Sequence, residues 1–453
     1  MIVRRAPRSR TRVALLLLLA AVLYGLLCAP PASAHAELVR SAPKDGAELA
    51  KAPGHLTLVF DEAVEPGDVR VMTPDGDRLP VTRAPRAGDE SVRVALDSAL
   101  DGPASGKFAV IWSIVDEKDG HASSGRIAFG IGTKAAVHQD RVDEAAGVPS
   151  PSSTVRKGLV AARWAGYLSL ALFVGGLGFV ALLWPRGAQE RRARMLLALA
   201  WVGGLVSTVA GLGLQGAYVA FGGLRDVVRA GTYADVLITE PGIVLAARGL
   251  LWVLAAVVLA SLLHGGARSA RSPGWRVGAL AVTLGLLRTT GMAGHNSEGT
   301  EPTWGAVADL VHLLGASLWV GGLVMLVVAV LPRREPGELS AVVPRYSRLA
   351  AASVLAVAVA GLVLAWQVVE SYDALLSTSY GHLLLLKTGV LAVVMVAAHF
   401  SRQWVRTRLD LAVLLRGDAA AVRPFGYSVA AETGLVLVVL AVTSLLVMAD
   451  PGR

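Results

Sequence analysis

Residues 304–331 read WGAVADLVHLLGASLWVGGLVMLVVAVL, an almost uninterrupted run of apolar residues. As an α-helix rising 1.5 Å per residue, it is long enough to cross a hydrocarbon core of roughly 30 Å. Asp309 is its only charged residue. A run of this length with so little charge predicts a transmembrane helix.

Similar apolar runs precede and follow this one, and together they predict an all-α polytopic membrane domain of about eight transmembrane helices. The predicted spans are residues 157–183, 194–221, 243–264, 274–294, 304–331, 347–369, 382–401 and 427–449. Lys and Arg concentrate in alternate loops: Arg191 and Arg192 follow the first span, whereas loop 295–303 has neither residue type. By the positive-inside rule, both ends of the domain lie outside the cytoplasm.

The composition agrees with a membrane protein and excludes several functional classes. Charged residues make up 17% of the chain, where soluble proteins carry about a quarter. The formal net charge is +9, but the Arg clusters lie in short loops between apolar runs, so they are interpreted as topology signals rather than a nucleic-acid surface. No nucleotide-binding loop, catalytic triad or nucleophile motif occurs, so we do not expect an enzyme.

A cleavable signal peptide is predicted over residues 1–34. Arg residues crowd the first twelve positions, an apolar run follows, and Ala32-Ser33-Ala34 forms a small-residue cleavage site. Cleavage there makes His35 the first residue, so that its α-amine and imidazole can chelate one metal ion. The single cysteine, Cys28, lies in the leader, so the mature chain is expected to have no disulfide and no thiolate metal ligand.

Residues 35–135 are expected to form a small extracytoplasmic all-β domain. Apolar residues alternate with polar or smaller ones in short stretches such as 56–60 and 108–114, and turn signals separate these stretches. The pattern is typical of an antiparallel sandwich or a Greek-key barrel. Polar residues 136–156 are expected to form a flexible linker to the membrane domain at 157–449.

Three residues of the β domain are candidate metal ligands. Asp119 and His121 are two apart, so in an extended chain their side chains point to the same face. With the amine and imidazole of His35 they offer three nitrogens and one oxygen, which suits tetragonal Cu(II) better than zinc or Cu(I). The alternative is that Asp119 belongs to an ordinary turn and both histidines are solvated.

Four residues are candidates for a copper path through the membrane. Met292 and His295 lie at the outer end of the fourth span, and Asp309 and His312 lie three apart in the fifth. His312 is roughly 14 Å in from Thr303 at 1.5 Å per residue. A charge at this depth costs roughly 3 kcal/mol, so such groups are expected to pair or to bind something. The competing interpretation is that each histidine hydrogen-bonds a neighbouring helix. Arg248, Arg288 and Lys387 lie nearer the outer ends, and side chains of this length are able to extend their charges to the surface.

Two stretches of the β domain resemble a known family. HAELVRSAPKDGA at 35–47 and LTLVFDEAV at 56–64 resemble the N-terminal part of the CopC family of periplasmic copper-binding proteins, and the run 112–125 resembles that family's last loop and strand. The resemblance implies an immunoglobulin-like β fold and a Cu(II) site at His35, Asp119 and His121. Because Asp116-Glu117-Lys118 departs from the family pattern, Asp116 and Asp119 both remain candidates for the acidic ligand.

The membrane domain carries a second resemblance. Gly294-His295, Asp309-x-x-His312 and SLWVGGL at 317–323 look like the signature of the CopD family of copper-resistance membrane proteins. RYSRLA at 345–350 and YGHLLLLK at 380–387 fit the same family. The resemblance implies copper uptake across the cytoplasmic membrane, with the β domain supplying the metal.

The sequence therefore predicts a copper-binding, copper-transporting protein of the cytoplasmic membrane, with copper and the lipid bilayer as partners and no nucleic acid. Cu(II) is expected in the β domain, and Cu(I) suits the Met and His ligands of the membrane path better. Two alternatives stay open. One is a haem-b electron carrier with intramembrane histidines as axial ligands, and the other is a copper sensor or oxidase-assembly factor that transports nothing.

Overall fold

The computed structural model describes most of the chain in four stretches. These are residues 38–132 except 62, 73–77, 80–81, 85–89, 97–105 and 117–121; 152–292 except 221 and 238; 302–368 except 334; and 381–392, with the separate residues 395, 396, 403, 439, 442 and 443. The described residues fall into two compact units. One contains the β strands with residues 152–159 and 209–246, and the other contains residues 160–208 and those from 247 onward.

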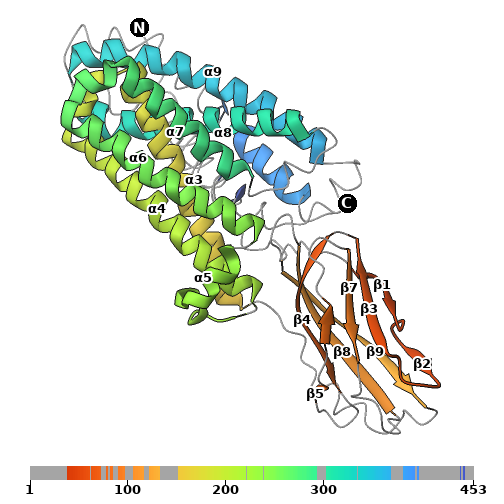
Figure 1. Cartoon of the computed structure of the whole chain (residues 1–453). Helices are drawn as coiled ribbons and strands as arrows, with labels where there is room; N and C mark the ends of the chain where they lie inside the picture. The colour runs from red at the N-terminus through yellow and green to blue at the C-terminus, as the bar shows by residue number, and fades with distance from the viewer. Residues whose placement is uncertain are drawn as a thin grey trace. The chain divides into compact units, whose positions relative to one another are not determined.

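Within the described part of the N-terminal region, the strands form two sheets (Figure 1). The first has the order β1-β3-β7-β6, with bounds Leu38–Ala42, His55–Phe60, Ser91–Ala95 and Thr82–Ala84. The second has the order β2-β9-β8-β4-β5, with bounds Ala47–Leu49, Ala122–Ile131, Gly106–Asp116, Val64–Met72 and Arg78–Leu79.

The alternating apolar residues face one core between the two sheets. Leu58 of β3 and Val110 of β8 are at most 1% exposed and belong to the same buried cluster. The rings of Phe60 and Trp112, one from each sheet, meet edge to face with centroids 5.1 Å apart. The predicted all-β domain is confirmed, as two sheets that share a core.

One pairing departs from the predicted antiparallel arrangement, because β2 runs parallel to β9. The turn before β2 explains this direction. Gly46, with φ of 75°, donates its N–H to Ala128 O at 2.7 Å, and Asp45 Oδ1 accepts from Ala128 N at 2.8 Å. These bonds carry the chain from the edge of the first sheet onto the edge of the second, so β2 runs in the same sense as β9.

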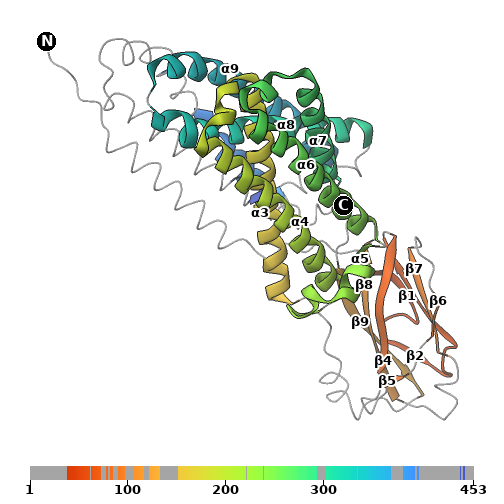
Figure 2. The same cartoon turned by 60° about the vertical axis from the view of Figure 1, so that its left-hand side comes forward.

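From Ser153 onward the described chain is mostly helical (Figures 1 and 2). The long helices are α3 Ser153–Leu182, α4 Arg191–Val219, α6 Glu240–Arg271, α7 Pro273–Gly291, α8 Pro302–Met325 and α9 Pro336–Val368. Shorter elements are η1 Pro185–Gln189, η2 Asp226–Val228, α5 Ala230–Leu237, the π-helical turn η4 Leu326–Val330 and η5 Leu331–Arg333. α6 is interrupted at Gly266, where φ is 57°. α8 packs against α7 and α9.

Five described helices are long and apolar enough to cross a membrane: Ser153–Leu182, Arg191–Val219, Pro241–Arg271, Thr303–Arg333 and Pro336–Trp366. α7 falls outside this set, since Arg276 and Arg288 lower the hydropathy of its 19 residues. Of the seventh predicted span, the structure describes the apolar helix Gly381–Ala392. The eighth lies almost entirely outside the described residues. The polytopic helical domain is confirmed, and the total of eight stays a prediction.

Small residues let α3 and α8 pack backbone to backbone. A Cβ on Gly175 would collide with the backbone of Ser317 and Gly321, and a Cβ on Gly321 would collide with the backbone of Ala171. Each helix thus presents two small residues four apart at the crossing, a common way for membrane helices to approach closely. The stretch that carries Ser317 and Gly321 therefore fixes the position of α8, which also bears Asp309.

The other side of this stretch contacts α9. Gly322 lies against the Tyr346 ring, and Tyr346 Oη donates to Trp319 O at 2.6 Å. Helix packing on both sides of α8 thus accounts for the small and aromatic residues of the SLWVGGL stretch at 317–323.

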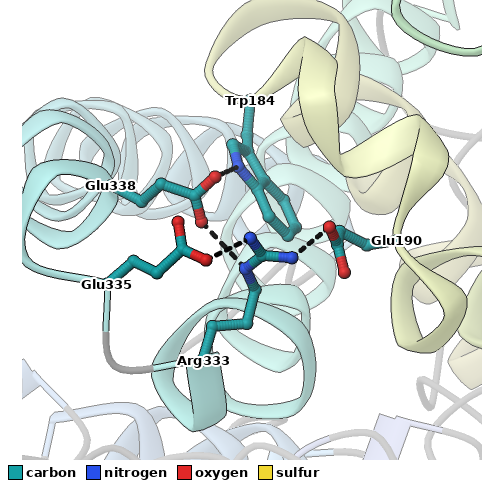
Figure 3. A network of polar contacts seen from close by, with 5 residues as sticks. All are labelled: Trp184, Glu190, Arg333, Glu335 and Glu338. Carbon is teal, nitrogen blue, oxygen red and sulfur yellow. Dashed lines mark hydrogen bonds and ion pairs between the residues drawn. The ribbon is translucent and has the colours of Figure 1, made fainter.

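A polar network joins the end of α8 to the start of α9 and to the α3–α4 connection (Figure 3). Arg333 pairs with Glu190, with Glu335 at 2.6 Å and with Glu338 at 3.0 Å. Glu338 also accepts a hydrogen bond from Trp184 Nε1 at 3.3 Å. One guanidinium therefore holds three carboxylates, one from the α3–α4 connection and two from the start of α9, and it clamps the end of α8 that is remote from Asp309.

Candidate functional site

The strand registers bring the chain positions that flank the predicted Cu(II) ligands to one end of the β domain. Leu38, at the start of β1, lies opposite Phe60, the last residue of β3. Val64, at the start of β4, lies opposite Asp116, the last residue of β8, and β9 begins at Ala122. Because the chain passes directly from Phe60 to Val64, the start of β1 and the β8–β9 connection lie at the same end of the two sheets.

The predicted ligands themselves are not among the described residues. His35 precedes Leu38, while Asp119 and His121 belong to the β8–β9 connection, and all three lie outside the described stretches. Within the part of the chain that the structure describes, no three His, Cys, Asp or Glu side chains are grouped to hold a metal ion. The set His35, Asp119 and His121 stays a prediction, as does the choice between Asp116 and Asp119.

In the membrane domain, Asp309 is buried against the end of α7. It is 7% exposed, and its Oδ2 occupies the space that a Cβ on Gly291 would need. Met292 directly follows Gly291 and is 37% exposed. The structure thus brings Asp309 next to the segment that carries Met292, whereas His295 lies outside the described residues.

His312 contacts α9 instead. Its Nδ1 lies 3.1 Å from Val357 O, and its ring lies beside Gly361, where an added Cβ would come within 3.3 Å of Cε1. Because a carbonyl oxygen only accepts, Nδ1 carries the proton and Nε2 keeps the lone pair that a metal ligand needs. Asp309 and His312 are close along α8, as their spacing indicates, but they contact different neighbouring helices.

Lys387, on the helix Gly381–Ala392, lies within electrostatic range of both Asp309 and His312. Its side chain is half-buried, and the same helix packs through Leu386 against the cluster that contains Trp319. The carboxylate charge of Asp309 is therefore partly offset by an ammonium from a different helix. Asp309 thus supplies one negative charge in apolar surroundings, close to the His312 imidazole. A metal cation that enters would compete with the Lys387 ammonium for this charge.

The sequence interpretation did not single out Tyr167, which lies near Asp309. Tyr167 of α3 lies in electrostatic range of Asp309, Arg163 and Arg248. Arg248 donates through Nη2 to Thr289 O of α7, and its buried Nε has no hydrogen-bond partner among the residues that the structure describes. The available signal was the four-residue spacing of Arg163 and Tyr167, which places both on one side of α3.

Three family models match successive parts of the chain. The CopC domain model matches residues 38–132, the model for the Copper resistance protein D-like N-terminal domain matches 153–305, and the model for Copper resistance protein D matches 340–446. This one chain therefore contains both CopC and CopD family domains. Residues 306–339 of this CopC–CopD chain fall between the matched ranges, so the models say nothing specific of Asp309 or His312.

Several curated proteins are similar to this CopC–CopD chain. Copper transport protein CutJ of Bacillus subtilis (strain 168) is 28% identical over 407 residues, which cover 85% of this chain and 71% of CutJ. Copper resistance protein D of Pseudomonas syringae pv. tomato is 25% identical over 62% of this chain and 93% of its own length. Protein YobA of Escherichia coli (strain K12) is 29% identical over 24% of this chain and 90% of its own length.

Among solved structures, CopC from Methylosinus trichosporium OB3b is matched over 23% of this chain and 99% of that chain. The sequence identity is 20% and the TM-score is 0.20. A match with this score gives no support for the fold. The assignment of CopC and CopD domains comes from the sequence comparisons alone.

Proposed function

We propose that this CopC–CopD chain captures copper with its β domain and carries it into the cytoplasm through its membrane domain. One observation carries the proposal: a CopC domain and CopD segments occur in one polypeptide, and 85% of it aligns with a protein named for copper transport. A binding module and a membrane module in one chain need no diffusional encounter between them, because the linker sets a high effective concentration.

For the β domain, we propose a Cu(II) site made by the amine and imidazole of His35, His121 and either Asp119 or Asp116. Support comes from the strand registers, since the chain positions that lead to these residues lie at one end of the two sheets. Three nitrogens and one oxygen fit the tetragonal preference of Cu(II). The immunoglobulin-like topology is part of the same proposal.

For the membrane domain, we propose a path from Met292 and His295 to Asp309 and then to His312. The burial of Asp309 beside the Gly291–Met292 turn supports the first step, and the lone pair on His312 Nε2 supports the second. A copper ion that reaches Asp309 competes with Lys387 for the carboxylate. Competition of this kind favours release as well as binding, which conduction requires.

The orientation is also a proposal. Eight spans with both ends outside place the β domain outside and the Arg-rich loops in the cytoplasm. In this arrangement residues 1–34 are the signal peptide, 35–135 the β domain, 136–156 the linker and 157–449 the membrane domain. Met292 then lies at the outer side, where the β domain delivers copper.

Net copper flux into proteoliposomes tests the function. Purified full-length chain should accumulate copper inside vesicles well above protein-free vesicles. Stoichiometric copper binding without accumulation would contradict transport and favour the sensor or assembly role. A haem Soret band in the purified protein would favour the electron carrier instead.

A further inference from the structure

The connection between α4 and α6 folds back along α4. A Cβ on Gly213 would lie 2.5 Å from Val227 O and 2.6 Å from Tyr233 Oη. A Cβ on Gly216 would likewise lie 2.5 Å from Thr232 Cγ2. The two glycines therefore form a flat surface on α4, and both η2 and α5 pack against it.

This packing fixes the level of the connection relative to the end of α4. Gly213 lies six residues before Val219, the end of α4, which is roughly 9 Å at 1.5 Å per residue. α4 is one of the candidate membrane spans. The segment beside Gly213 therefore lies level with the last turns of this candidate span, and not beyond its end.

Asp226 holds the turn that carries η2. Its carboxylate accepts from Arg229 Nη1 at 2.9 Å and from Gly223 N at 2.9 Å. The hydrogen bond from Arg229, aided by that from Gly223, keeps the pKa of Asp226 below its usual value. The Asp226 carboxylate therefore stays ionised at an anionic membrane surface, where the local pH is lower than in bulk, and the turn stays closed.

The turn leaves apolar side chains uncovered. Val228 is 80% exposed and Leu224 is 57% exposed, and Ile243, at the nearby start of α6, is 57% exposed. Arg225 and Arg229 alternate with these residues in sequence and are also exposed. Apolar side chains interleaved with arginines, at the level of a span end, are characteristic of segments that lie in the membrane interface.

We propose that residues 222–229 are an interfacial anchor that inserts Leu224 and Val228 into the lipid while Arg225 contacts lipid phosphates. The partner is the phospholipid surface on the side where α4 ends. The anchor fixes the outer end of α4 and the start of α6 at a set depth. This assignment depends on the membrane topology but not on copper transport.

Spin labels test the anchor in the full-length chain. Val228→Cys, in a Cys28→Ser background, is labelled and reconstituted in nanodiscs that contain anionic phospholipid. Its collision rate with oxygen, which concentrates in lipid, should exceed that with a water-soluble nickel complex. Asp235→Cys, an exposed polar position of the same connection, should show the reverse. A nickel-accessible label at Val228 would overturn the proposal.

A second arm tests the arginine. The oxygen preference at Val228 should increase when zwitterionic lipid is replaced by anionic lipid, and Arg225→Gln should remove that increase. Arg225 is chosen because Arg229 holds the turn. A Val228 label that neither reagent reaches would mean that protein covers the site, and it would also overturn the lipid assignment.

Discussion

The Asp309 carboxylate fills the space beside Gly291, so that any side chain at residue 291 must displace it. Gly291→Ala is therefore expected to move Asp309 off the proposed path and to lower copper uptake roughly tenfold, the effect of about 1.4 kcal/mol. Uptake into proteoliposomes measures this directly.

Gly278→Ala is the matched control for that variant. Gly278 lies inside the same helix and has open space where a Cβ would go, so that Ala there adds helix propensity, about 1 kcal/mol, without a collision. It should transport copper normally. Equal losses in the two variants would show that α7, and not Asp309, is sensitive to the change.

The hydrogen bond from His312 Nδ1 to Val357 O allows its packing role to be separated from its metal role. Asn places an amide N–H near the Nδ1 position and has nothing at Nε2. His312→Asn should keep the protein folded and still abolish copper uptake, as His312→Ala should. If His312→Asn transports as the unmodified chain does, the histidine serves only helix packing.

His264→Asn is the control for the histidine series. His264 is exposed, and its Nδ1 bonds Ala260 O of its own helix at 2.7 Å, away from the proposed path. Uptake should be unchanged in this variant. A loss equal to that of His312→Asn would contradict the path.

The Cu(II) site predicts specific losses of affinity in the isolated β domain, residues 35–135. His121→Ala should weaken Cu(II) binding strongly, because the connection then supplies one ligand instead of two. Asp119→Asn and Asp116→Asn should differ, and the larger loss identifies the acidic ligand. Electron paramagnetic resonance should show a nitrogen-rich tetragonal centre, and one extra residue before His35 should change that spectrum by removing the α-amine.

The Arg333 network predicts an order of stabilities. Arg333→Gln leaves three nearby carboxylates without their shared cation, and it should lower the stability of the purified protein by about 1–3 kcal/mol. Arg333→Lys should recover only part of this, since an ammonium cannot match the planar fork of a guanidinium. Glu335→Gln should have a smaller effect than Glu338→Gln, because the Glu335 side chain is 53% exposed and that of Glu338 14%. Thermal unfolding in detergent ranks the four variants.

Period-two alternation was sufficient to predict the two sheets, because one face of each strand must be buried. It could not predict that β2 pairs parallel to β9, since that pairing depends on the turn at Asp45 and Gly46 and on a distant strand. Hydropathy predicted the long helices directly. It says less about α7, where two arginines weaken the signal.

For the candidate site, the sequence identified residues but not their neighbours. Polarity in an apolar span was enough to single out Asp309 and His312. Asp309 contacts α7, His312 contacts α9, and Lys387 lies near both. These relationships depend on how helices distant in sequence pack against one another. The stretch 317–323 is accounted for by backbone contacts with α3 and α9, which no inspection of one helix reveals.

The π-helical turn at Leu326–Val330 ties the length of α8 to its polar clamp. A π turn accommodates one residue more than an α turn, and each added residue rotates the remainder of the helix by roughly 100°. The direction of Arg333 as seen from His312 is therefore set by a single inserted residue. A deletion of any one residue between 326 and 330 would remove none of the residues of the network. It would nevertheless rotate Arg333 so that its guanidinium points away from Glu190. In an alignment of related chains, a one-residue gap here and the loss of Arg333 or its acidic partners are expected to occur together, as one inherited change.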